Sequence, residues 1–89
     1  MADWTSLSAV ERNDIEHKLI AALNSIGIKV AVTRWNVPSQ LPHWQLLIET
    51  SWCKEHIRSE ILIALDQAMA RADVQAPING VILKSHKEK

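Results

Sequence analysis

The spacing of the apolar residues changes once, near Gly27, and this change is the strongest constraint on the fold. After Gly27, the apolar residues Ile28, Val30 and Val32 alternate with Lys29 and Ala31, which is typical of a half-buried strand. Before it, the apolar residues recur at the 3.6-residue period of a helix, and they are Ile15, Leu19, Ala22, Leu23 and Ile26. The chain therefore has to pack helical and extended segments against one another.

The first helix has clear start and stop signals. Ser8 and Glu11 have the spacing of a capping box, in which the Ser8 hydroxyl accepts an amide hydrogen bond and the Glu11 carboxylate accepts one from the cap residue. Gly27 is suited to the left-handed residue that ends a helix. We predict a helix over residues 9–26.

Two strands follow, joined by a loop. Residues 44–52 alternate in character, and we predict that Trp44, Leu46, Ile48, Thr50 and Trp52 face the helices. Pro38 and Pro42 interrupt the ladder, so the simplest pairing is an antiparallel hairpin with a loop over 36–42. Continued alternation places Lys29, Ala31, Thr33 and Trp35 of the first strand on the other face, together with His43, Gln45, Leu47 and Glu49 of the second.

The second half of the chain has a helix and a strand. Ser51 is a suitable cap for a helix whose apolar stripe runs from Ile57 to Ala72, and Pro77 blocks its continuation. Val81, Ile82 and Leu83 indicate a third strand. The pair Asn79-Gly80 fits a type I′ turn that joins 74–78 with 81–85, or a bulge within one strand; we favour the single strand.

The predicted fold is an α/β (α+β) two-layer sandwich in the order α-β-β-α-β. A three-stranded sheet carries two helices on one face, and its other face is only partly apolar. We expect one domain over residues 1–89, with an ordered core over about 8–85 and flexible tails at both ends.

Charge and cysteine content limit the function classes. Ten basic and ten acidic side chains balance, so long-range attraction to nucleic acid or to an anionic membrane is weak. No apolar run approaches the roughly 20 residues of a membrane-spanning helix, and the N-terminus has no targeting pattern. Cys53 is the only cysteine, which fits a reducing compartment, so we expect a cytoplasmic protein.

In the order of its elements alone, the chain resembles small α-β-β-α-β modules such as BON domains and the ring-building domains of secretion systems. It is also loosely similar to KH-type RNA-binding domains. The KH resemblance implies a Gly-x-x-Gly loop, whereas the two glycines here are Gly27 and Gly80.

The sequence gives little support to catalysis. Cys53 and His56 are the one reactive-looking pair, with Cys53 expected in the first turn of a helix, where the helix dipole favours a thiolate. No phosphate loop, zinc-protease or hydrolase motif occurs, and His17, His43 and His86 are scattered. We predict no enzymatic activity, no catalytic residue, no metal site and no cofactor.

The tryptophans indicate where a partner would bind. All four aromatic residues of the Phe, Trp and Tyr class are tryptophans, and two of them flank the proline-containing loop. Aromatic residues and arginine dominate interface hot spots, and loops often carry recognition. The predicted partner-binding residues are Lys29, Arg34, Trp35, Val37, Leu41, His43 and Trp44.

These observations favour a non-enzymatic protein-interaction or assembly module, which binds a protein partner or a second copy of itself through the open sheet face and the 34–44 loop. The first alternative is a single-stranded nucleic-acid binder that stacks a base on Trp35 beside Arg34 and Lys29. The second alternative is a cysteine-dependent enzyme that uses Cys53.

Overall fold

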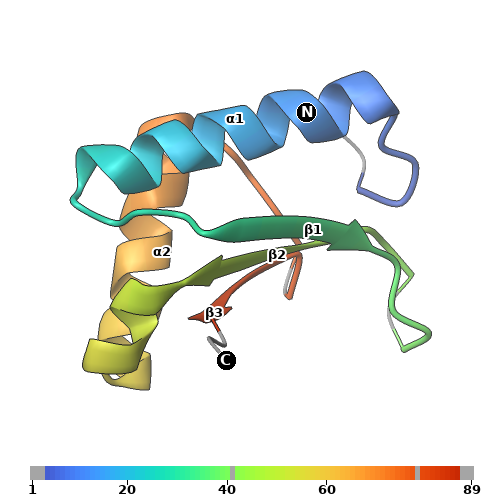
Figure 1. Ribbon diagram of the computed structural model, residues 1–89. Helices are drawn as coiled ribbons and strands as arrows, with labels where there is room; N and C mark the ends of the chain where they lie inside the picture. The colour runs from blue at the N-terminus through green and yellow to red at the C-terminus, as the bar shows by residue number, and fades with distance from the viewer. Residues whose placement is uncertain (1–3, 41, 78, 87–89) are drawn as a thin grey trace.

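The computed structural model describes residues 4–40, 42–77 and 79–86. Along the chain the elements are α1 (Ala9–Ser25), β1 (Val32–Asn36), β2 (Gln45–Thr50), the 3-10 helix η1 (Ser51–Glu55), α2 (Arg58–Ala72) and β3 (Val81–Ser85) (Figure 1). The predicted class of two helices and a three-stranded sheet in α-β-β-α-β order is confirmed.

Helix α1 begins and ends as its capping residues predict. The Ser8 hydroxyl accepts a hydrogen bond of 3.1 Å from the Glu11 amide, and the Glu11 carboxylate accepts one of 3.0 Å from the Ser8 amide. Gly27 follows the helix with a φ of +88°, a left-handed conformation that other residues rarely adopt. The predicted helix over 9–26 is thus correct to within one residue.

The sheet order is β1-β2-β3, with β2 in the centre. β1 pairs antiparallel with β2, which confirms the predicted hairpin, and β3 pairs parallel with β2. Residues in register point to the same face of a sheet. The buried residues Leu46 and Ile48 of β2 face the helices as predicted, together with their β3 partners Val81 and Leu83.

A bulge at Ala31 and Val32 overturns the predicted orientation of the first strand. Val32 is the register partner of Glu49, yet the Ala31 amide also donates a hydrogen bond of 2.8 Å to the Glu49 carbonyl. Two residues therefore oppose one, which is the arrangement of a β-bulge, and the side-chain alternation shifts by one position. Thr33 and Trp35 are in register with Ile48 and Leu46, so they face the helices instead of the open side.

The predicted cap at Ser51 is wrong, because the chain first forms η1. The Thr50 hydroxyl accepts a hydrogen bond from the Trp52 amide at 3.3 Å and caps this short helix. Helix α2 begins only at Arg58, where the Glu60 carboxylate accepts a hydrogen bond from the Ile57 amide at 3.1 Å. Asp73 ends α2 in a left-handed conformation, with a φ of 54°.

The third strand is confirmed, but neither predicted arrangement of Asn79-Gly80 is found. The Gly80 amide donates a hydrogen bond of 2.9 Å to the Pro77 carbonyl and closes a turn, in which Asn79 has a φ of 64°. Residues 74–77 form no strand, and Ile78 lies outside the described residues. A side chain on Gly80 would meet Pro77 at 2.9 Å, so this tight turn requires glycine.

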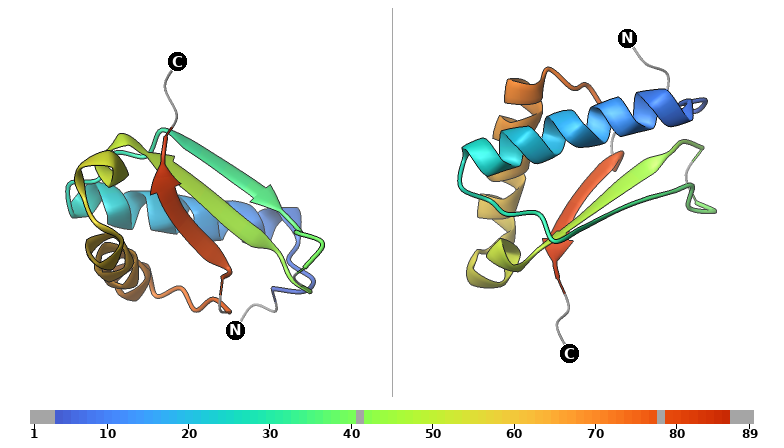
Figure 2. Two further views of the ribbon diagram at one scale, coloured as in Figure 1. Left: turned by 90° about the horizontal axis from the view of Figure 1, so that it is seen from below. Right: turned by 45° about the horizontal axis from the view of Figure 1, so that its top comes forward.

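The core lies between the sheet and the two helices. α1 crosses one face of the sheet, while α2 contacts α1 and stands on the β3 side of the sheet (Figures 1 and 2). The largest fully buried side chains lie on α1, β2 and the segment between α1 and β1, and they are Leu19, Leu23, Ile28, Leu46, Ile48 and Thr50. Trp4 and Leu7 are also buried, so the core extends beyond its predicted limit at residue 8, and residues 87–89 of the expected C-terminal tail lie outside the description.

Candidate protein-interaction site

The tryptophans that flank the loop belong to the core side of the molecule. Trp35 and Trp44 are half-buried and pack against the core, with their ring centroids 6.5 Å apart in an edge-to-face arrangement. The buried Trp4 ring lies 5.6 Å from that of Trp35. The Trp35 indole N–H is buried and has no hydrogen-bond partner among the described residues. Trp35 is therefore a packing residue, not the exposed centre of a binding loop.

Arg12 of α1 covers Trp44 from the helix side. Its guanidinium carbon lies 4.1 Å from the centroid of the Trp44 ring, which is a cation–π distance. The same guanidinium donates a hydrogen bond of 2.9 Å to the Leu7 carbonyl. These contacts attach the segment before α1 to the start of β2.

The remaining predicted partner residues are divided between two ends of the hairpin. Arg34 and Val37 are exposed, and the half-buried His43 places its Nδ1 atom 3.0 Å from the Trp44 carbonyl oxygen. Leu41 lies outside the described residues. Lys29 is exposed before β1, beside the last residue of β2, so the structure does not bring it together with the loop.

The described helices leave the sheet face opposite α1 uncovered. In the view from below, the sheet lies in front of α1 and neither described helix crosses this face (Figure 2). Each strand contributes one half-buried apolar side chain to it, namely Val32, Leu47 and Ile82. Leu47 is in register with both Arg34 and Ile82, so it occupies the middle of the face.

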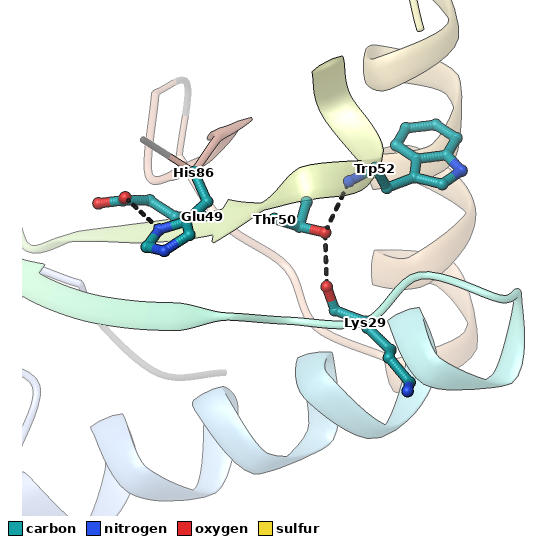
Figure 3. Close-up of polar contacts among 5 residues, drawn as sticks. All are labelled: Lys29, Glu49, Thr50, Trp52 and His86. Carbon is teal, nitrogen blue, oxygen red and sulfur yellow. Dashed lines mark hydrogen bonds and ion pairs between the residues drawn. The ribbon is translucent and has the colours of Figure 1, made fainter. Parts of the chain in front are cut away.

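Charged groups surround these apolar residues. Arg34 and Lys84 are exposed, and Glu49 lies between their strands, in register with Val32 and Lys84. The Glu49 carboxylate lies 3.2 Å from Nδ1 of His86 (Figure 3). The face thus combines an apolar centre with charges of both signs, which is the composition of a polar-rimmed interface.

At the end of β2, the buried Thr50 hydroxyl connects the segment before β1 with the start of η1. The Thr50 hydroxyl, which is fully buried, donates to the Lys29 carbonyl and accepts from the Trp52 amide (Figure 3). The Trp52 ring stacks on His56 with centroids 3.7 Å apart, and His56 Nδ1 lies 2.8 Å from the Trp52 carbonyl oxygen. These contacts give His56 a structural role, in which it holds the Trp52 ring and the end of η1.

The surroundings of Cys53 do not favour a nucleophile. Cys53 lies in η1 and not in the first turn of α2, so the predicted support from a helix dipole is wrong. Burial raises the pKa of its thiol, which disfavours the thiolate at neutral pH. Within the described part of the chain, no cluster of three or more His, Cys, Asp or Glu side chains has a metal-binding arrangement.

Sequence reasoning missed two features of this site. It identified Leu47 and Glu49 on the open face but placed Trp35 there in place of Arg34, because the bulge left no clear signal in the sequence. It also missed the groove between α2 and β3, which depends on where the parallel third strand lies beside the helix.

No protein-family model, no curated protein and no solved structure shows a significant match to this chain. No helix in the described residues has the length and apolar character needed to cross a membrane.

Proposed function

We propose that this chain is a non-enzymatic protein-interaction or assembly module. It binds a protein partner, or a second copy of itself, through the open face of its sheet and the adjoining exposed residues of the 34–44 loop. The observation that carries this proposal is the uncovered face centred on Leu47, with Val32 and Ile82 on the neighbouring strands.

The composition of the face supports binding to protein. Its three apolar side chains are half-buried within the isolated chain, so a partner that covers them removes the remaining apolar surface from water. Arg34, Lys84 and Glu49 give it charges of both signs, which favour a partner with a complementary pattern. The reducing cytoplasm is the proposed compartment, since Cys53 is free and buried.

The test is a charge placed at Leu47. Leu47→Glu puts a carboxylate in register with Arg34, which is a favourable cross-strand pair, so the fold should persist while the face loses its apolar centre. Val10→Glu is the matched control, because Val10 is 79% exposed on α1, away from this face.

Tagged wild-type protein and both variants would be purified from the native lysate with and without nuclease, and each would be examined by sedimentation velocity. We expect a nuclease-resistant protein partner or a self-associated species that Leu47→Glu loses and Val10→Glu keeps. If the wild type is monomeric and Leu47→Glu retains every co-purifying protein, the proposal is wrong.

The two alternatives predict different behaviour. A single-stranded nucleic-acid binder would lose its co-purifying material on nuclease treatment and would bind oligonucleotides with a steep dependence on salt. Trp35 packs against the core and Lys29 lies beside the end of β2, which reduces the support for this function. A cysteine-dependent enzyme would require rapid labelling of Cys53 near neutral pH.

A further inference from the structure

The outer edge of β3 borders a groove instead of a further strand of the described chain. The groove has a volume of about 610 Å³, and its walls include all of Val81–Ser85 together with one side of α2. Successive side chains of a strand point to opposite faces, so a cavity that touches five consecutive residues runs along the edge of the strand. The volume lies in the range of ordinary ligand sites.

Two hydrogen bonds show which backbone groups line this edge. The Leu46 amide donates to the Gly80 carbonyl at 2.8 Å, and the His86 amide donates to the Thr50 carbonyl at 3.2 Å. Because alternate residues of a strand turn toward the same neighbour, the N–H and C=O groups of Ile82 and Lys84, together with the Gly80 carbonyl and the His86 amide, turn toward β2. The N–H and C=O groups of Val81, Leu83 and Ser85 therefore point toward the groove, and no backbone bond to them is found in the described chain.

The opposite wall is mainly apolar, although the exposed Asp66 of α2 also lines it, and the end of the groove beside Arg58 and Lys84 is basic. Ile61, Leu62, Leu65 and Met69 line the α2 side at helical spacing, and Leu62 is 52% exposed. Arg58 and Lys84 also line the groove, where β3 ends near the first turns of α2 (Figure 1). Both cations are exposed, and neither has an ion-pair partner among the described residues.

We propose that this groove binds an extended peptide segment of another protein, which pairs with β3 as a fourth strand. The unpaired N–H and C=O groups of Val81, Leu83 and Ser85 recognise an extended backbone. Leu62 and its neighbours contact an apolar side chain of the peptide. Arg58 and Lys84 attract a carboxylate at the end of the peptide that lies beside them. This surface is distinct from the open face, which it meets along β3.

The probe is a library of random peptides displayed on phage and selected against the intact protein. We expect the selected sequences to combine alternating apolar residues with an acidic residue at one end. A synthetic peptide from the selection would then be titrated against the variants described below. A selection without enrichment would overturn the proposal.

Two pairs of variants separate the edge and the helix wall from the rest of the surface. Ser85→Pro removes an N–H that points outward and therefore breaks no bond to β2, whereas Ser85→Ala keeps that N–H. Leu62→Asp changes the apolar wall, and Val10→Asp is its exposed control on α1. We expect about a tenfold loss of affinity or more for Ser85→Pro and Leu62→Asp, and less than about a twofold change for both controls.

A second measurement distinguishes strand pairing from other docking. Hydrogen exchange of the Leu83 amide should slow when the peptide binds, because this amide gains a partner, while the Ile82 amide is already bonded to β2. Arg58→Glu should lower the affinity for the acidic peptide about fivefold or more, and Leu47→Glu should leave that affinity unchanged. Equal affinity for all groove variants, or unchanged exchange at Leu83, would exclude strand addition without affecting the open-face proposal.

Discussion

The Trp44 amide donates a hydrogen bond of 2.8 Å to the Trp4 carbonyl, which attaches the N-terminal segment to the start of the central strand. Trp4 is only 5% exposed, and its ring lies 5.6 Å from that of Trp35. The first residues of the described chain thus complete the core at the loop end of the sheet.

Replacement of Trp4 should consequently destabilise the whole domain. Trp4→Ala removes a buried indole and leaves a cavity beside Trp35, so we expect a loss of about 3 kcal/mol in the free energy of unfolding. Urea denaturation monitored by circular dichroism measures this loss. Val10→Ala, at a position 79% exposed, should change stability by less than about 0.5 kcal/mol. A Trp4→Ala protein as stable as that control would show that the segment does not contribute to the core.

The parts of the fold that local signals specify could be predicted from the sequence. Ser8 and Glu11 set the start of α1 through their own side chains, and Gly27 sets its end through its backbone freedom. The alternation from Leu46 to Thr50 fixed the buried face of β2, because every second residue of an uninterrupted strand shares one face.

The parts of the fold that depend on hydrogen bonds between distant residues could not be predicted from the sequence. The bulge exists because Ala31, through its amide, and Val32, through the strand register, both oppose Glu49, and no residue type in this stretch requires that arrangement. One shifted residue was enough to exchange Trp35 for Arg34 on the open face. In the same way, Ser51 and Thr50 are both good cap residues, and only the bond between Thr50 and Lys29 shows which one is held in place.

Arg12 should stabilise the fold through its shape as well as its charge. Its guanidinium covers the Trp44 ring at 4.1 Å and donates to the Leu7 carbonyl at 2.9 Å. We expect Arg12→Ala to lower the free energy of unfolding by about 1–2 kcal/mol. Arg12→Lys keeps the charge but not the planar group, so it should recover only part of this loss in the same urea experiment. Full recovery by lysine would show that charge alone accounts for the effect.

The buried hydroxyl of Thr50 should matter more than its methyl group. Thr50→Val keeps the shape of the side chain but leaves the Lys29 carbonyl and the Trp52 amide without their partner, so we expect a loss of about 1–3 kcal/mol. Thr50→Ser retains the hydroxyl and should be the more stable of the two variants. Equilibrium unfolding in urea ranks them, and the reverse order would mean that the two hydrogen bonds contribute less than the buried methyl group.

The Cys53 thiol should make the stability of the fold depend on alkaline pH. Burial raises the pKa of this thiol in the folded state above the value of about 8.5 for an exposed cysteine. The folded chain therefore keeps the proton to a higher pH than the unfolded chain. The contribution to stability is complete below about pH 8.5 and is lost as the pH rises through the folded-state pKa.

Cys53→Ala isolates this effect from the titration of other groups, since it removes the thiol and little else from η1. We expect the free energy of unfolding of the wild type to fall more steeply than that of Cys53→Ala between about pH 8 and pH 10. Iodoacetamide should label native Cys53 slowly near neutral pH and rapidly in urea, because the thiol becomes exposed only on unfolding. A constant difference between the two proteins across this range, or rapid native labelling, would show that Cys53 ionises readily in the folded state and would restore the cysteine-nucleophile hypothesis.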